Sequence, residues 1–270
     1  MNGNDLHSFF QKLNPDLWLT ETCDGFKFGD QTTEIKGTAV TWMATMSVIE
    51  TAISHGHNFI VTHEPTFYNL FKILPFPCPK SRDRDQIEDF ENDLVYRKKI
   101  DYLSRNNMVV YRLHDTWDTL DAYGILDSWA TALSFNKMIA FDGHHKVYEI
   151  SPIPLGELGK QIKRRMKLKC IRIVGKLESI ARKIGLGVGA WGTIDNLKAC
   201  MKMGADVFVT GETCEWQTVR FAEDCGIAMI VVGHINSENF GMRNLARFLR
   251  NAFPHLNVEF IDAEDPYHYL

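Results

Sequence analysis

Short apolar runs that end directly in polar residues recur along this chain. Residues 229–232 form one such run, and four apolar residues are too few for a helix but typical of a buried strand. Gly233 ends the run, and His234 and Glu238 follow four residues apart. Apolar residues then repeat at helical spacing from Leu245 onward. We therefore predict His234 at the carboxyl end of a strand and Glu238 in the first turn of the next helix, where open α/β sheets place their ligand sites.

The same pattern occurs earlier in the chain. Residues 109–113 form an apolar run interrupted only by Arg112, and His114 and Asp118 follow it, again four residues apart. Aligning position 114 with position 234 places Asp118 on Glu238. Both segments therefore read as a strand, a histidine and a carboxylate one helical turn later.

A second pair of segments also matches. Residues 52–64 read as a helix closed by glycine, a strand, and then Thr62, His63 and Glu64. Residues 199–212 have the same order and end in threonine, glycine and Glu212. The two matched pairs need offsets of 148 and 120 residues, so the copies would differ in loop length. An internal duplication explains both pairs, and two copies facing each other would form one shared site.

These elements predict a mixed α/β fold in two halves, with sheets flanked by helices. The order of a strand at 38–43, a helix at 47–54 and a strand at 59–62 is a βαβ-like unit, which makes its sheet at least partly parallel. Pro152 and Pro154 mark the junction between halves 1–150 and 151–270. Proline-rich residues 72–92 read as either a lid or a solvated insertion. Further predicted helices are 5–13, 93–105, 126–133, 155–166, 194–203 and 214–224, and further strands are 146–150, 171–174 and 207–210.

Composition narrows the range of functions. The 270 residues have a net charge of −4, which gives no electrostatic reason to bind nucleic acid or an anionic membrane. The six cysteines have no C-x-x-C pair or zinc-finger spacing, and we expect reduced thiols in a cytoplasmic protein. No apolar run approaches the roughly 20 residues that span a bilayer. The first residues do not resemble a signal peptide.

Two other motifs have competing interpretations. Residues 187–192 fit the dinucleotide-binding pattern G-x-G-x-x-G, but the only candidate ribose-binding acid, Asp206, precedes the next strand instead of ending it. A tight turn between a strand and a helix is the alternative. His144 and His145 are adjacent and lie between a glycine and a strand, so they read as either a metal-binding pair or a surface turn.

Seven polar side chains are predicted at strand carboxyl ends or one turn beyond. They are His63, Glu64, His114, Asp118, Glu212, His234 and Glu238. Converging carboxylates repel one another unless a cation lies between them. A mixture of imidazole and carboxylate suits zinc, iron or manganese, and a bridging carboxylate allows two metals about 3.5–4 Å apart. A structural polar cluster without metal is the alternative.

Four of these stretches resemble the motifs of a known family, the Ngg1-interacting factor three-like proteins, also catalogued as GTP cyclohydrolase 1 type 2. Residues 60–65 resemble its apolar-T-H-H-P, residues 111–118 its A-H-T-x-x-D, residues 209–212 its T-G-D/E and residues 233–238 its G-H-x-x-S/T-E. The closing Asp265-Pro-Tyr also resembles the family's ending. The resemblance runs from about residue 37 to the C-terminus.

The resemblance implies two divalent transition metal ions. His63 and His234 would hold one ion, Glu64 and Asp118 the other, and Glu238 would bridge them. It also implies intertwined α/β halves, a homohexameric ring and a small-molecule substrate, with a nucleotide as the candidate. Two departures stand out: Glu64 replaces the family's second histidine, and residues 22–26 replace its N-terminal tryptophan-aspartate stretch.

Two functions of different classes follow. The first is a dinuclear metal-dependent hydrolase of the GTP cyclohydrolase 1 type 2 kind, in which His114 or Glu212 moves protons while a metal-activated water attacks the substrate. The second is a metal-binding scaffold or regulatory partner with little catalysis. A ring that encircles nucleic acid is disfavoured by the acidic charge balance.

Overall fold

The computed structural model describes residues 1–19, 22–67 and 93–270, and divides into two compact units. The first unit comprises residues 1–124 and 242–263, and the second comprises 125–241 and 264–270. The chain therefore passes between the units three times. Each unit contains one mixed sheet and is described by itself.

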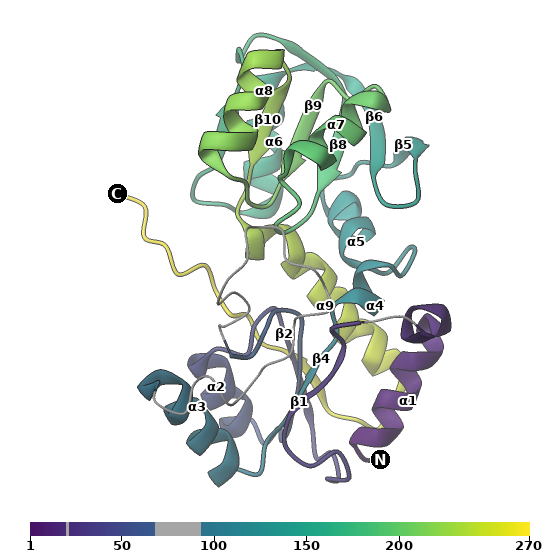
Figure 1. Ribbon diagram of the computed structural model, residues 1–270, viewed down its shortest axis with the longest axis vertical. Helices are drawn as coiled ribbons and strands as arrows, with labels where there is room; N and C mark the ends of the chain where they lie inside the picture. Colours follow the sequence, from purple (N-terminus) through teal and green to yellow (C-terminus); the bar gives the residue numbers. More distant parts are fainter. Residues whose placement is uncertain (20–21, 68–92) are drawn as a thin grey trace. The chain divides into compact units, whose positions relative to one another are not determined.

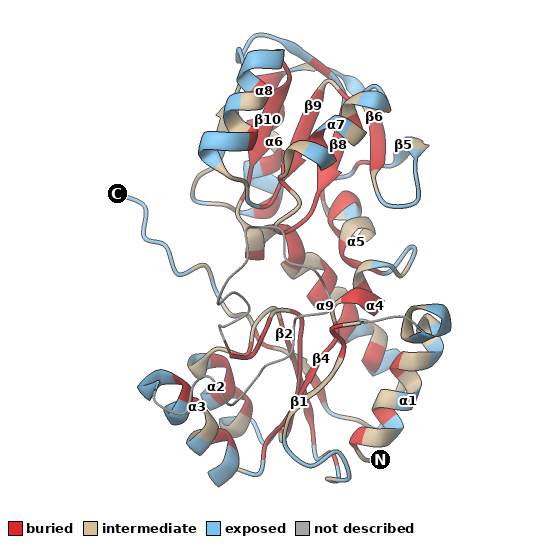
Figure 2. Ribbon diagram, in the orientation of Figure 1, coloured by how far each residue is buried: buried red, intermediate tan, exposed pale blue. Residues whose placement is uncertain are grey.

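The first unit contains a five-stranded sheet in the order β1-β4-β3-β2-β11. Its strands are β1 (Gly25–Phe28), β4 (Val109–Arg112), β3 (Phe59–Thr62), β2 (Thr38–Thr41) and β11 (Val258–Phe260). The last four are parallel, and β1 joins β4 antiparallel. Strands β2, β3 and β4 are buried at every position (Figure 2), as expected for parallel strands covered on both faces.

Helices cover both faces of this sheet (Figure 1). Helices α2 (Met46–Ser54) and α3 (Leu94–Arg105) contribute to an apolar core against β2, β3 and β4. On the other face lie α1 (Gly3–Leu13) and the end of α9 (His234–Ala252), where Phe9 contacts the rings of Phe248 and Phe253. A short 3-10 helix (Pro15–Leu19) follows α1, and the one-turn helix α4 (Asp115–Asp118) follows β4.

The second unit contains a six-stranded sheet in the order β5-β6-β8-β9-β10-β7. Its strands are β5 (Lys137–Phe141), β6 (Lys146–Pro154), β8 (Ile180–Gly187), β9 (Val207–Thr210), β10 (Ala228–Val231) and β7 (Arg172–Val174). Strands β8, β9 and β10 are parallel, and the others join antiparallel. One face carries a core to which α7 (Ile194–Lys202) and α8 (Arg220–Cys225) contribute, and a π-helical turn (Glu215–Val219) precedes α8. Helices α5 (Ile125–Ala132) and α6 (Leu155–Met166) pack together through Trp129 and Met166.

The predicted fold class is confirmed: both units are mixed α/β, and each sheet is mixed and flanked by helices. The compact units do not coincide with the predicted halves 1–150 and 151–270, because β5 pairs with β6, β6 pairs with β8, and β11 pairs with β2. The insertion predicted at 72–92 lies outside the described residues. Within the part of the chain that the structure describes, no helix is long and apolar enough to cross a membrane. The five cysteines of that part are free thiols.

Candidate metal centre

Parallel strands bring the first group of predicted site residues to one edge of the first sheet. Thr62 and Arg112 are paired in register at the ends of β3 and β4, so the residues that follow these two strands emerge side by side. His63, His114 and Asp118 each offer one ligand atom, and these atoms lie within 4.8 Å of one another. The order strand–histidine–carboxylate in the sequence therefore produces a three-residue group that a metal ion fits.

His63 presents one ring nitrogen to this group. Its side chain is fully buried, and its Nδ1 lies 3.3 Å from the Leu113 carbonyl oxygen, which can only accept a hydrogen bond. The proton therefore sits on Nδ1, and Nε2 offers its lone pair toward Asp118, whose Oδ1 is 3.6 Å away. The imidazoles of His63 and His114 stack with centroids 4.3 Å apart. Fixing one nitrogen by a main-chain acceptor is how proteins orient metal-binding histidines.

A distant carboxylate, Asp24, fixes the start of α4. Its two oxygens accept the main-chain N–H groups of His114, Asp115 and Thr116 at 2.6, 2.9 and 2.8 Å. These are the amide groups that a helix leaves unsatisfied at its N-terminus. Asp24 therefore holds His114 and the turn that carries Asp118.

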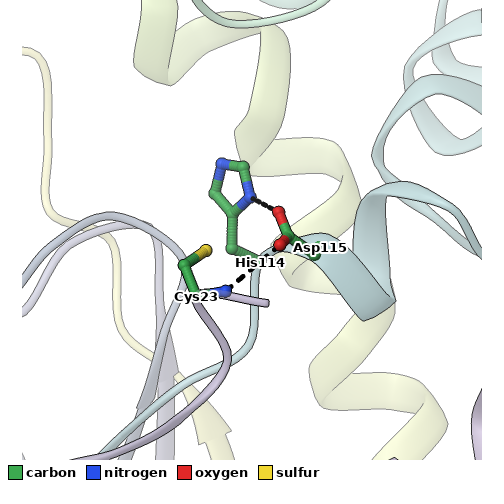
Figure 3. Close-up of side chains that lie close together, drawn as sticks. All are labelled: Cys23, His114 and Asp115. Carbon is green, nitrogen blue, oxygen red and sulfur yellow. Dashed lines mark hydrogen bonds and ion pairs between the residues drawn. The ribbon is translucent and has the colours of Figure 1, made fainter. Parts of the chain in front are cut away.

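Asp115 orients the His114 ring (Figure 3). Its Oδ1 lies 2.9 Å from Nδ1 of His114, and its Oδ2 accepts the main-chain N–H of Cys23 at 3.2 Å. Asp118 Oδ2 lies farther from the same nitrogen, at 3.5 Å. With Nδ1 occupied by Asp115, Nε2 of His114 is the nitrogen left for a metal or a substrate proton.

Cys23 completes this cluster without being a reactive thiol. One ligand atom each of Cys23, His114 and Asp115 lies within 4.8 Å of the others. Burial raises the pKa of the Cys23 thiol well above its ordinary value, so the sulfur stays protonated at neutral pH. The three residues therefore do not form a cysteine nucleophile with its base.

Glu64 lies beside a buried cation. Its Oε2 is 4.0 Å from Nη2 of Arg112, and the same guanidinium donates from Nε to the His63 carbonyl oxygen at 2.7 Å. Arg112 ends β4 and is 4% exposed, so little solvent screens its charge from the carboxylate. The residue that departs from the family motif therefore has a positive neighbour inside the protein.

The second unit repeats the arrangement at the ends of β9 and β10. His234 begins α9, and its Nδ1 lies 3.0 Å from Glu212 Oε2 while its Nε2 lies 3.2 Å from Glu238 Oε2. Glu238 is 4% exposed, and Glu212 is half-exposed. The structure thus brings Glu212, His234 and Glu238 together, with the imidazole held between two carboxylates.

Gly189 packs directly against this pair. Its φ is +49°, and a Cβ built on it would lie 2.0 Å from Glu238 Oε1 and 2.8 Å from His234 Nε2. Its carbonyl accepts the Glu212 N–H at 2.7 Å, and its own N–H donates to Ser237 Oγ at 2.9 Å. The glycine-rich stretch 187–192 is a turn between β8 and α7, as one of its two interpretations predicts, and it shapes the space beside Glu238.

The seven predicted residues therefore form two groups, one in each unit. His63, Glu64, His114 and Asp118 lie at the first sheet, and Glu212, His234 and Glu238 lie at the second. Sequence reasoning missed Asp24, Arg112, Asp115 and Gly189. His144 and His145 lie in the turn between β5 and β6, where Asp142 accepts both of their main-chain N–H groups.

Comparison with known proteins identifies the family. A model of the Duf34/NIF3 (NGG1p interacting factor 3) family matches residues 1–83 and 84–266. The chain belongs to this family. Among the relatives of this Duf34/NIF3 chain, a Clostridium perfringens protein named GTP cyclohydrolase 1 type 2 homolog is 26% identical, with 100% of both chains covered. A Clostridium acetobutylicum protein of the same name is 28% identical, over 87% of this chain and 84% of the relative.

Solved structures agree with the fold. A hypothetical protein of Staphylococcus aureus superposes with a TM-score of 0.80 at 20% identity, covering 100% of this chain and 99% of the other. A Bacillus cereus protein related to NIF3 gives a TM-score of 0.77 at 17% identity, with the same coverage. At such identities the likeness concerns the fold.

Proposed function

We propose that this Duf34/NIF3 protein is a metal-dependent hydrolase of the GTP cyclohydrolase 1 type 2 kind, acting on a nucleotide or a related small molecule. The names of the relatives and the two groups of ligand-type side chains support this proposal. The proposed cofactors are two divalent transition metal ions, zinc, iron or manganese, because the side chains combine imidazoles with carboxylates.

One observation carries the proposal. In each unit a histidine has one nitrogen held by an oxygen and the other facing a carboxylate: Leu113 O and Asp118 for His63, and Glu212 and Glu238 for His234. Metal-binding histidines are oriented in this way, by a hydrogen bond on the nitrogen that does not bind the metal.

We assign His63, Glu64, Asp118, His234 and Glu238 as the residues that hold the metals, with Glu238 as the bridge. The bound ions would act as Lewis acids and lower the pKa of a bound water. We also propose that these two groups of ligands surround one common metal centre.

Two further residues handle protons. His114 is assigned as the general base, because Asp115 occupies its Nδ1 and leaves Nε2 to accept a proton from the reacting group. Glu212 holds a proton at Nδ1 of His234 in its hydrogen bond of 3.0 Å. Its half-exposed carboxylate is also accessible for exchanging a proton of the reacting group with solvent.

The first test compares two isosteric substitutions by metal analysis of protein purified without chelators. Glu238→Gln removes a ligand from both proposed metals and should lose most of the bound metal. Asp118→Asn removes a ligand from one metal and should lose at most about half. Glu215→Gln is the matched control, because Glu215 is an exposed carboxylate of the second unit paired with Arg172. Equal metal content in Glu238→Gln and the control, with no fall in melting temperature, would refute the bridge.

A substrate screen separates the hydrolase from the scaffold. We expect the metal-loaded protein to hydrolyse GTP or another nucleotide, and His114→Gln to lose at least about a hundredfold in kcat while keeping its metals. A protein that retains its metals but turns over no nucleotide or phosphoester is the scaffold. The resemblance also leads us to propose a homohexamer, which sedimentation analysis of the purified protein tests directly.

A further inference from the structure

Two imidazoles and a carboxylate converge at the opposite end of β3 from the candidate centre. His55 Nδ1 and His57 Nε2 each lie 2.9 Å from the same oxygen, Oε2 of Glu259. One ligand atom from each of the three residues lies within 4.8 Å of the other two. His57 precedes His63 by six residues, which is about 20 Å along an extended strand, so this group is separate from the candidate centre.

Local structure explains the convergence. His55 is the C-cap of α2, and Gly56, with a φ of +79°, makes the turn into β3. The turn directs His57 inward, where its side chain is 1% exposed, while His55 remains at the surface at 47%. Glu259 lies on β11, the edge strand next to β2, and reaches both rings from there.

The corresponding turn of the second sheet has the same backbone but different chemistry. Helix α7 ends at Lys202, Met203 is its C-cap, and Gly204, with a φ of +89°, leads toward β9. Met203 and Ala205 occupy the positions of His55 and His57. The turn therefore does not require histidines, and their presence in the first sheet needs a separate reason.

We propose that His55, His57 and Glu259 form a binding site for one divalent transition metal ion of the zinc class. Two imidazoles and one carboxylate are a ligand set that zinc uses in sites with a fourth, open position. Magnesium and calcium ions are disfavoured at this site, because both prefer ligand sets made of oxygen atoms.

The geometry fits after a small expansion. Zinc bonds of about 2.0–2.2 Å in a tetrahedron place neighbouring ligand atoms roughly 3.3–3.5 Å apart. The two nitrogen–oxygen distances of 2.9 Å must therefore widen by about half an ångström. His55 and Glu259 are 47% and 41% exposed and free to make that adjustment, while buried His57 stays in place.

The second nitrogen of His57 limits the affinity. When Nε2 binds a metal, the ring proton must sit on Nδ1, which is buried and has no hydrogen-bond partner among residues 1–19, 22–67 and 93–270. An unsatisfied buried donor weakens binding by roughly ten- to a hundredfold. We therefore expect a weaker affinity for zinc than at a site whose histidines are hydrogen-bonded at both ring nitrogens.

Zinc titration of the full-length protein, stripped of metal with a chelator, tests the site. We expect Glu259→Gln and His55→Ala each to weaken one equivalent of zinc binding by at least about tenfold. His268→Ala is the matched control, because it removes an exposed imidazole from the second unit. This control should bind zinc as the wild type does, and calcium should not compete.

Substitutions at the candidate centre make the two sites distinguishable. Asp118→Asn and Glu238→Gln should leave the zinc equivalent at His55, His57 and Glu259 unchanged, whether or not the proposed function is correct. Thermal melts without metal show whether each variant is folded. If Glu259→Gln does not fold, His55→Ala alone decides the test, because it changes only an exposed ring. Wild-type stoichiometry and affinity in a folded His55→Ala or Glu259→Gln protein would overturn the proposal.

Discussion

In the first unit, single residues that are distant in the sequence hold the side chains of the candidate centre in position. Asp24 accepts three main-chain N–H groups of α4, and Asp115 then holds the His114 ring. The position of His114 therefore depends on a residue 90 positions earlier in the chain. Neither acid needs to touch a metal for its loss to affect binding there.

We predict that Asp24→Asn destabilises the protein. The amide keeps one acceptor oxygen but loses the negative charge and the second acceptor, which should reduce the free energy of unfolding by about 1–3 kcal/mol. Chemical denaturation measures this change. Asp30→Asn is the control, because Asp30 also accepts a main-chain N–H, from Thr32, but at an exposed position. Equal stability of the two variants would contradict the role of Asp24.

Glu64 should change the preference for metal. A carboxylate is a harder ligand than imidazole, so manganese and iron should gain relative to zinc. We predict that Glu64→His shifts competition between manganese and zinc by about tenfold toward zinc, measured by dialysis against both metals. Arg112 lies 4.0 Å from Glu64, and its positive charge competes with a metal ion for the Glu64 carboxylate. Arg112→Gln should therefore strengthen manganese binding. An unchanged manganese-to-zinc ratio in Glu64→His would mean that residue 64 is not a ligand.

The predicted residues share one signal, a polar side chain directly after an apolar strand or one helical turn beyond it, and the structure places all seven in such positions. Asp24 lacks this signal, because it precedes strand β1. Asp115 directly follows His114, but its role of holding the neighbouring ring depends on a contact that the pattern does not reveal. Arg112 gave a weaker signal, because it is the single charged residue within an apolar run. Residues that position others therefore need the three-dimensional contacts to be found.

At the scale of elements, the two sheets repeat one construction. In each, three parallel strands end in the same plane: β2, β3 and β4 in the first sheet, and β8, β9 and β10 in the second. The main-chain N–H groups of Glu64 and Glu212 both donate to the strand-end segment of the neighbouring strand, to Trp42 O and Gly189 O. This likeness supports the internal duplication, which stays a prediction.

The turn between β8 and α7 should be intolerant of any side chain at Gly189. We predict that Gly189→Ala lowers metal content by at least about half, because the added Cβ would overlap Glu238 Oε1 and crowd His234 Nε2. Gly204→Ala is the control, since φ is also positive there, at +89°, but its Cβ would meet only the Lys183 side chain. Both variants should lose about 1 kcal/mol from backbone strain. Equal metal content in the two variants would show that Gly189 does not shape the site.

Elements with strong periodicity or an uninterrupted apolar run could be predicted closely. Strands 59–62 and 207–210 and helix 155–166 have the bounds that the pattern indicates. Strands β1, β5, β8 and β11 were missed. Strand β5 is largely exposed at the sheet edge, β8 contains Arg182 and Lys183, and β11 has three residues. Pairing with a neighbouring strand, and not local composition, defines these four.

At the scale of the whole molecule, residues 125–241 of the second unit are inserted in the sequence between the two segments of the first. The two ends of this insertion are neighbours, because a Cβ on Gly241 would lie 2.7 Å from Cα of Ile125. Segment 242–263 supplies β11 and the rings of Phe248 and Phe253 to the first unit. The first unit is therefore incomplete without a segment from near the end of the chain.

This connectivity predicts how fragments behave. Residues 1–150 alone should not unfold cooperatively, because Phe9 loses its contacts with Phe248 and Phe253 and β2 loses its edge neighbour. Joining 1–124 to 242–263 through a flexible linker of about four residues should restore a cooperative melt. Circular dichroism measures both. A cooperative transition in 1–150 would contradict the division into these compact units.

The same connectivity predicts that the second unit folds before the first during synthesis. Residues 125–241 are translated as an uninterrupted stretch that contains every strand of the second sheet, before β11 of the first sheet is translated. The 22 residues from 242 to 263 take about one to four seconds to add at roughly 5–20 residues per second. During that interval the apolar side chains of α1 that later meet Phe248 and Phe253 have no cover. The nascent chain therefore exposes an apolar face of α1, the kind of transiently uncovered surface that makes nascent chains prone to aggregation.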